Sequence, residues 1–199
     1  DVYKRQGLSP AERQELLEDA RNDAQWLIRV VENLLSITRI GDNQAHITKS
    51  LEPAEEVMGE TVLKFRRRFP GVSVSVEVPD DLLLVPMDPI LISQVLSNLL
   101  ENAAVHGRNT THIRLLLQAQ DGSAVFSVQD DGGGIPEKDL PTLFDGTLKH
   151  SETSSGDGKR NMGLGLSVCL AIVRAHDGGM AAKNLADGAE VSFSLPLDV

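Results

Sequence analysis

Three short motifs, which follow one another in a set order, constrain the fold of this chain more than any other feature. They are Asn98-Leu-Leu-Glu-Asn102, Asp130-Asp-Gly132-Gly-Gly134-Ile135-Pro136 and Gly163-Leu-Gly165-Leu166. The first is a pair of asparagines on one face of a helix, the second a glycine-rich turn after a strand, and the third a glycine pair that opens a helix. Each motif says little alone, so their order and spacing carry the interpretation.

The side chains of the first motif suit a site for a metal and phosphate. Asn102 offers an amide oxygen, a hard ligand that fits an octahedral Mg²⁺ also carrying phosphate oxygens and water. Asn98 lies one helical turn earlier on the same face and is placed to bond phosphate or metal-bound water. The alternative interpretation is a solvated helix face.

The second motif brings the backbone close to a ligand. Asp130 ends an expected strand, where its carboxylate can accept a hydrogen bond from a ligand amine. Gly132 and Gly134 permit a close approach because they carry no Cβ. The alternative is an ordinary Asp-Gly turn between two elements. We expect Asp131 to be solvated.

The third motif stands where a loop becomes a helix. Backbone N–H groups and the positive end of the helix dipole form an anion site there, and Gly163 and Gly165 leave room for a phosphate. The preceding segment, 145–161, is rich in Gly, Ser, Thr and Asp and is expected to be a mobile loop. A glycine pair of this kind is common, so it is informative only together with the other two motifs.

A long amphipathic helix is expected near the start of the chain. Ser9-Pro10 followed by Glu12 indicates an N-cap with an acidic first turn, and Gly41-Asp42-Asn43 indicates the end. A helix of about thirty residues with one apolar face needs partners to be stable. Its heptad seam consists of Leu17, Ala20, Ala24, Leu27, Val31, Leu34 and Thr38, broadened by Leu16, Ile28 and Leu35.

The rest of the chain alternates between strand and helix patterns. We expect strands over 46–51, 72–78, 82–87, 111–119 and 123–129, helices over 53–69, from Asp88-Pro89 onward and over 163–176, and two last strands around Asp187-Gly188. The economical solution is an α+β fold of two layers, with helices over one face of a mixed sheet.

The composition excludes several classes of protein. Hydrophobic residues make up 41% of the 199 positions and charged residues 24%, as in ordinary globular proteins. A net charge of -10 disfavours binding to the nucleic-acid backbone. No run approaches the ~20 apolar residues of a membrane span. The single cysteine, Cys169, forms no disulfide or metal set, suits a reducing cytoplasm, and is expected to be a buried, inert thiol.

In order and spacing, the three motifs resemble the N, G1 and G2 boxes of the Bergerat (GHKL) ATPase fold. Sensor histidine kinases, gyrase, Hsp90 and MutL share this fold. The resemblance to sensor histidine kinases covers residues 8–199, with Leu34-Leu-Ser-Ile-Thr-Arg39 similar to the end of the second dimerisation helix. Leu143-Phe144 resembles the F box that anchors an ATP lid, and 159–169 resembles Kdp-type, potassium-responsive kinases. The resemblance implies a partial dimerisation and phosphotransfer helix in 1–43 and a catalytic ATP-binding domain in 44–199.

By this resemblance the chain binds Mg-ATP, with Asn102 as the metal ligand, and transfers the γ-phosphate to a histidine for relay to a response-regulator aspartate. Asp130 would select adenine over guanine. The implied catalytic residues are Asn98, Asn102 and Arg160. The implied nucleotide-binding residues, beside Asn102, are His106, Asp130, Gly132, Gly134, Ile135, Phe144, Lys159, Arg160, Gly163, Leu164, Gly165 and Leu166.

The chain departs from the family pattern at two places in these motifs. The family usually has a lysine three residues after the metal-binding asparagine, where this chain has Val105. Lys149, Lys159 or Arg160 is then expected to supply the charge, unless these residues serve only the solubility of the loop. The usual His-Gly-Gly after the last helix is also altered, to His176-Asp177-Gly178. His106 stands where the family often has a residue beside the nucleotide; the alternative is a packing role.

No histidine fits the acceptor motif of the family, in which an acidic residue follows the histidine and a proline comes a few places later. The candidates are His46, His106, His112, His150 and His176. We therefore expect a fragment that begins at the second helix and lacks its own acceptor. Expected partners are a response regulator, the rest of the kinase (acceptor helix and sensor region) and a second copy, but no nucleic acid. The expected location is the cytoplasmic side of a membrane-anchored bacterial sensor kinase.

Two other functions stay open. An anti-sigma-type protein-serine kinase has the same ATPase fold but would not usually need the long heptad helix. A catalytically idle nucleotide-sensing or dimerisation module is the second alternative, and Val105 is its best support. A gyrase- or MutL-like function is weaker, because Asn98 stands where those ATPases carry a glutamate base, and an amide cannot activate water.

Overall fold

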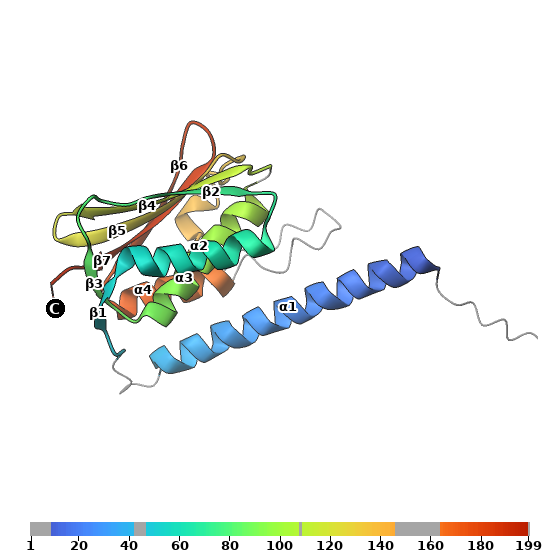
Figure 1. Cartoon of the computed structure of the whole chain (residues 1–199), viewed down its shortest axis with the longest axis horizontal. Coiled ribbons are helices and arrows are strands. Elements are labelled where there is room, and N and C mark those ends of the chain that lie inside the picture. Colours follow the sequence, from blue (N-terminus) through green and yellow to red (C-terminus); the bar gives the residue numbers. More distant parts are fainter. Residues whose placement is uncertain (1–8, 42–46, 108, 146–163, 199) are drawn as a thin grey trace, which may run out of the picture.

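A computed structural model describes residues 9–41, 47–107, 109–145 and 164–198. A five-stranded sheet carries α2, α3 and α4 on one face, and the long helix α1 lies outside this helical layer (Figure 1). The expected two-layer α+β architecture is therefore confirmed. Part of the loop expected over 145–161 lies outside the described residues, because they stop at Asp145 and resume at Leu164.

The sheet is mixed, as the sequence predicted. Its strand order is β2-β4-β5-β7-β6, in which β2 and β4 are parallel and the other neighbours are antiparallel. Hairpins at Asp121-Gly122 and Asp187-Gly188 join β4 to β5 and β6 to β7. The strands are β2 Ser73–Glu77, β4 His112–Gln120, β5 Ser123–Asp130, β6 Gly179–Asn184 and β7 Ala189–Pro196.

Three helices form the second layer: α2 Ala54–Arg68, α3 Pro89–His106 and α4 Leu164–Ala175. A 3-10 helix, η1 Leu140–Thr142, follows the glycine-rich motif. The middle helix, α3, packs on both neighbouring helices, and its core residues are Leu91, Ile92, Val95, Leu96, Leu99, Leu100 and Ala103. Beneath it, Phe126 of β5 and Phe193 of β7 stack with ring centroids 4.6 Å apart. The layers therefore share one apolar core.

A second, two-stranded sheet pairs β1 Ser50–Pro53 with β3 Leu84–Met87. The strand expected over 46–51 was thus placed too early, because pairing with β3 sets its register and ends it at Pro53. The expected alternation of 72–78 also holds only in part. Val74 is buried, but Val76 and Val78 are exposed, because β2 is an edge strand and ends at Glu77.

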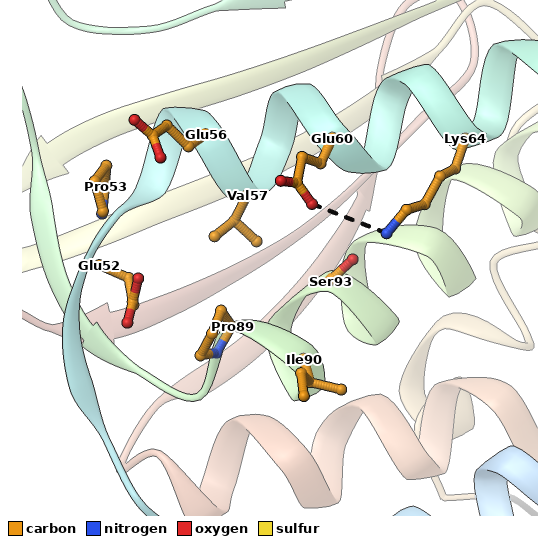
Figure 2. A pocket seen from close by; sticks show the side chains of 9 residues that line it. All are labelled: Glu52, Pro53, Glu56, Val57, Glu60, Lys64, Pro89, Ile90 and Ser93. Atoms are coloured by element: carbon orange, nitrogen blue, oxygen red, sulfur yellow. Dashed lines mark ion pairs between the residues drawn. The ribbon is translucent and has the colours of Figure 1, made fainter.

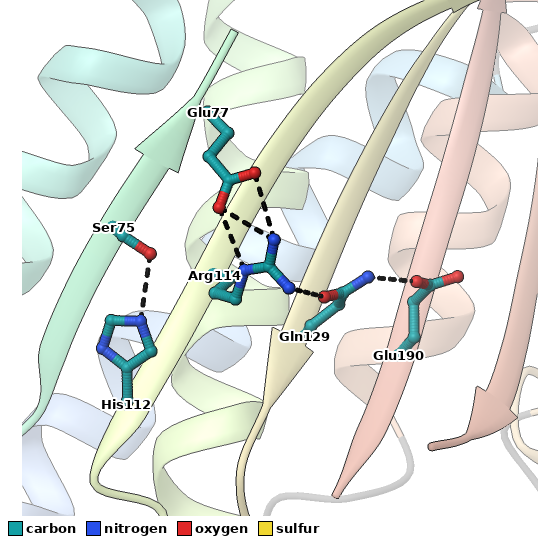
Figure 3. A network of polar contacts seen from close by, with 6 residues as sticks. All are labelled: Ser75, Glu77, His112, Arg114, Gln129 and Glu190. Atoms are coloured by element: carbon teal, nitrogen blue, oxygen red, sulfur yellow. Dashed lines mark hydrogen bonds and ion pairs between the residues drawn. The ribbon is translucent and has the colours of Figure 1, made fainter. Parts of the chain in front are cut away.

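The face of the sheet that carries no helix has a row of polar side chains across four strands (Figure 3). Arg114 pairs with Glu77 through two N–H donors and donates to Gln129, which donates to Glu190 at 2.6 Å. Alternate residues of a strand point to opposite faces, so this row faces away from the apolar core. Because its side chains are polar and bonded to one another, this face can remain exposed to solvent without a helix covering it.

The helix α1 Pro10–Gly41 has the bounds that the sequence predicted. Ser9 and Glu12 form a reciprocal capping box, with each side chain accepting from the other's backbone N–H at 3.2 and 2.7 Å. Helix α1 contacts α4 (Figure 1). Exposed apolar side chains remain on it at Leu16, Leu17, Leu27, Ile28 and Val31. Among the described helices, none has the length and apolar character needed to cross a bilayer.

Candidate functional site

Helix α3 carries a row of polar residues in steps of four: Asn98, Asn102 and His106. Residues four apart lie on one helix face, and all three are half-buried. The amide nitrogen of Asn98 approaches the sulfur of Cys169 on α4 at 3.6 Å. This contact shows that the polar row lies on the side of α3 that faces α4.

Two further contacts fix how α4 runs beside α3. The backbone N–H of Asp88, at the start of α3, donates to Nε2 of His176, just after α4, at 3.0 Å. Near the middle, the thiol of Cys169 lies against the carbonyl of Val95. The helices are therefore antiparallel. One turn back from Cys169 is Gly165, and one turn on from Asn98 is Asn102, so the first turn of α4 lies beside Asn102.

The first turn of α4 has the backbone geometry that suits an anion at this place. Its N–H groups have no partners within the helix, and the helix dipole is positive there. At Gly165 a Cβ would meet no described atom within 4 Å, so internal packing of the described residues does not require this glycine. The position is consistent with an approach by a ligand. The side chains of Lys149, Lys159, Arg160 and Leu164, and the residue Gly163, lie outside what the structure describes.

Asp130 lies beside Gly107, at the end of the polar row that carries His106. Its Oδ1 accepts from the N–H of Gly132 at 2.9 Å, and partial burial raises the pKa of the carboxyl above its ordinary value. Glycines surround it: a Cβ on Gly107 would lie 3.2 Å from Oδ1, and one on Gly188 would lie 2.9 Å from it. Asn102 and Gly107 are separated by roughly 7.5 Å of helix rise. The residues expected to contact a base and those expected to contact phosphates therefore lie along one helix.

The glycines of the second motif have an additional role within the fold. A Cβ on Gly132 would lie 1.8 Å from the carbonyl oxygen of Gly107, so the loop passes directly against the end of α3. Gly134 has φ 72°, a conformation that favours glycine. We predicted that these two residues admit a ligand; the structure shows that Gly132 and Gly134 also meet requirements of the chain itself.

Asp131 is exposed, which confirms the expectation that it is solvated. Its carboxylate also accepts hydrogen bonds from the N–H and hydroxyl of Thr111 and from the N–H of His112, at 2.6 to 3.0 Å. Desolvation acts in the opposite direction and raises the pKa of this carboxyl, but the hydrogen bonds together lower it to about 2. Asp131 therefore ties the glycine-rich loop to the start of β4.

His176 is a structural residue. Its side chain is 1% exposed, and burial lowers the pKa of the imidazole. Because Nε2 accepts from Asp88, Nδ1 carries the proton and donates to the carbonyl of Ile172 at 2.8 Å. Asp177 follows with φ 63° and pairs with Lys49. It stands at a left-handed position, which explains why a glycine suits it in the family pattern.

Four other residues that the sequence singled out differ in their surroundings. Phe144 is half-buried against the core beside the buried Leu143, as an anchor for the following segment would be. Burial lowers the pKa of His106. Cys169 is fully buried, as expected, and burial raises the pKa of its thiol to about 12. Val105 is 47% exposed and leaves room for a longer side chain.

Sequence reasoning missed Asn184, the last residue of β6. Its Oδ1 accepts from the N–H of Ile135 at 2.8 Å, and its Nδ2 donates to the carbonyl of Ile135 at 2.7 Å. These contacts join residues 49 positions apart. A polar residue at a strand end is common, so no local signal distinguishes it.

A separate hollow of about 370 Å³ lies between the start of α2 and the start of α3 (Figure 2). Glu52, Glu56 and Glu60 line it, with Lys64 near Glu60. Carboxylates repel phosphate, so this hollow is unsuited to a triphosphate. The polar row beside α4 is the better candidate for a nucleotide.

Comparison with known proteins agrees with this geometry. The family described as histidine kinase-, DNA gyrase B- and HSP90-like ATPases matches residues 87–199, which include all three motifs. The chain belongs to this family. The ATPase domain thus begins no later than β3 and includes both ends of the polar row.

Its relatives are sensor kinases. The sensor protein KdpD of Clostridium acetobutylicum is 37% identical over 94% of this chain and 21% of that protein. The adaptive-response sensory kinase SasA of a Nostoc species is 32% identical over 99% of this chain and 49% of SasA. The chain therefore spans from about a fifth to half the length of these relatives. The expected resemblance to sensor histidine kinases, including the Kdp type, is confirmed.

Solved structures show the same fold. Histidine kinase ThkA in complex with response regulator protein TrrA matches with a TM-score of 0.73 at 22% identity, over 98% of this chain and 54% of that one. The Acinetobacter baumannii histidine kinase AdeS matches with a TM-score of 0.71 at 19% identity, over 97% and 87%. At these identities the likeness concerns the fold alone.

Proposed function

We propose that this chain is the ATP-binding catalytic part of a sensor histidine kinase, and that it transfers the γ-phosphoryl group of Mg-ATP to a histidine on another segment. The observation that carries the proposal is the antiparallel register of α3 and α4. It puts the open first turn of α4 beside Asn102, while Asp130 lies at the other end of the same polar row.

The donors along this row suit the parts of Mg-ATP. The amide oxygen of Asn102 is a suitable ligand for Mg²⁺, and the N–H groups of α4 suit the phosphates. The carboxylate of Asp130 suits the amine of adenine, which guanine lacks at that position. Bound Mg²⁺ would supply charge neutralisation, and the residues of the chain would position the nucleotide.

The proposed transfer breaks the bond between the γ-phosphorus and its bridging oxygen, and forms a bond to an imidazole nitrogen while ADP leaves. Among the described histidines of the ATPase domain, His176 is buried, both ring nitrogens of His112 contact serines, and His106 is half-buried at the end of α3. Helix α1 contains no histidine. We therefore assign the acceptor to a segment outside this chain.

The same proposal covers the surroundings of the domain. Residues 1–43 would be part of a dimerisation and phosphotransfer region, with a second copy packing on the exposed apolar residues of α1. The phosphoryl group would pass to an aspartate of a response regulator. We place the domain on the cytoplasmic side of a membrane-anchored kinase.

One observation favours a second candidate, a nucleotide-sensing module without phosphotransfer. Val105 is exposed where the family usually carries a lysine for the phosphates. Such a module would bind the nucleotide but would transfer nothing.

The test is thermal unfolding with and without Mg²⁺ and a nonhydrolysable ATP analogue, followed by transfer of labelled phosphate to a supplied histidine-containing domain. Ligand at a hundred times its dissociation constant should add about 2.7 kcal/mol. Val105→Lys should strengthen binding of ATP more than of ADP. No shift in the wild type would refute the nucleotide site, whereas a shift without transfer would favour the second candidate.

A further inference from the structure

Asn184 holds the glycine-rich loop from the side of the sheet. Both polar atoms of its side chain bond the backbone of one residue, Ile135, at 2.8 and 2.7 Å. We propose that Asn184 is a positioning residue for the adenine end of the nucleotide site, acting through the backbone of Ile135. This inference rests on the proposed function, because it assigns a role at that same site.

The contact has the pattern of one step of a β-ladder. Asn184 is the last residue of β6, and its amide offers one acceptor and one donor, as a neighbouring strand would. Ile135 follows Gly134, whose φ of 72° turns the chain. The amide thus fixes the point at which the loop leaves the site toward η1.

The loop is held at three places along its length. Asp131 is tied to the start of β4. The N–H of Gly133 donates to the carbonyl of Gly107, at the end of α3. Ile135 is held by Asn184. The first two contacts are close to Asp130. Among the described residues, Asn184 is therefore the contact that restrains the end of the loop farther from Asp130.

The hairpin that carries Asn184 also contacts the near end. Gly188 lies so close to Asp130 that a Cβ would be 1.8 Å from the carbonyl oxygen of Asp130. The N–H of Leu185 donates to the carbonyl of Gly188 and closes the turn. One hairpin therefore contacts the adenine-binding carboxylate and the end of the loop together, which fixes the distance between them before a ligand arrives.

The experiment compares three variants of the full chain by calorimetric titration with Mg-bound ATP analogue and with Mg-ADP. Asn184→Ala removes the amide, and Asn184→Asp keeps its size and one acceptor but loses the donor. Asp187→Ala is the matched control, an exposed residue in the same hairpin turn. We expect both Asn184 variants to bind the two nucleotides about tenfold more weakly, by one common factor, because the contact concerns the base and not the γ-phosphate.

Amide hydrogen exchange at Ile135 supplies a readout independent of affinity: it should become faster in both Asn184 variants and stay unchanged in Asp187→Ala. Variants with wild-type affinity, or an Asn184→Asp variant that binds like the wild type, would overturn the inference, as would a loss confined to the ATP analogue. If the wild type bound neither nucleotide, the proposed function would fail first and this inference with it, whatever the exchange at Ile135.

Discussion

The two ends of α3 differ in the residues that surround them and in how their polar groups are bonded. At the start, the side chain of Asp88 accepts from the N–H groups of Ile90 and Leu91, and its backbone N–H donates to the buried His176. At the end, Gly107 packs against Gly132, and the polar row of Asn98, Asn102 and His106 lies along the preceding turns of the helix. Every polar group named at the first end is satisfied within the chain.

At the second end the fold leaves polar groups available. Among the described residues, no hydrogen bond of the Asn102 side chain is found, and Asp130 keeps a half-buried carboxylate beside bare backbone. The comparison of the two ends shows that a helix can be held by hydrogen bonds at one end while polar side chains at its other end stay available for a bound molecule. We refer to these parts as the anchored end and the open end.

Removing His176 at the anchored end should cause the largest loss of stability among these variants. His176→Ala leaves a cavity and strips the partners from Asp88 and Ile172, so unfolding free energy should fall by about 2–4 kcal/mol. Urea unfolding measures it. The affinity of the folded fraction for nucleotide should not change. A loss of less than about 1 kcal/mol would show that the anchored end does not depend on this residue.

Asn102→Ala tests the open end. It should remove the Mg-dependent stabilisation by the ATP analogue, about 2.7 kcal/mol at a hundred times the dissociation constant, because the side-chain oxygen proposed to bind Mg²⁺ is lost. Stability without ligand should stay within about 0.5 kcal/mol. Val105→Ala, one turn along the same helix, is the control and should keep the full shift. Unchanged affinity in Asn102→Ala would remove its role at the metal.

The neighbouring aspartates sharpen the comparison within the open end. Asp130→Asn keeps the Oδ1 that accepts from Gly132, but replaces the other oxygen by a donor, so adenine nucleotides should bind about tenfold more weakly. Asp131→Asn should instead lower stability and leave base selection unchanged, because its oxygens bond Thr111 and His112. Titration with ATP and GTP analogues measures both. An equal loss for GTP in Asp130→Asn would refute base recognition.

The anchored end should also respond to acid. Burial lowers the pKa of His176 in the folded state, so the unfolded chain binds its proton first as the pH falls. Its contribution to stability is complete above the ordinary pKa of 6.5 and declines below it. Unfolding midpoints between pH 8 and pH 5, compared with His176→Ala, measure the difference. Identical pH slopes in the two proteins would contradict this cause.

The smallest change in stability is expected at Asp177, which follows His176 at the anchored end. Its positive φ disfavours a side chain, whereas its bond to Lys49 is on the surface. Asp177→Gly should therefore raise the unfolding midpoint slightly, and Asp177→Ala should lower it, because alanine loses the ion pair and keeps the strain. If both variants lowered the midpoint equally, the ion pair would outweigh the backbone conformation.

Much of this protein follows from local patterns. The bounds of α1, the cap at Asp88, the two Asp-Gly hairpins and the inert Cys169 were predictable because each depends on residues near one another in sequence. The motif order also indicated the ATPase family, because that resemblance depends on the identities and spacing of residues, which can be read along the chain.

The strand at 50–53 and the exposure of Val76 were decided by pairing partners far along the chain. Two of the three contacts that hold the glycine-rich loop, at Asp131 and through Asn184, likewise join distant segments. By itself the sequence determined which side chains carry functional groups that suit a metal, a base or a phosphate, because those groups belong to the covalent structure of each residue. Only the tertiary structure decided that α4 begins beside Asn102 and that the anchored end lies at His176, because helix register is set by packing between elements that no local pattern relates.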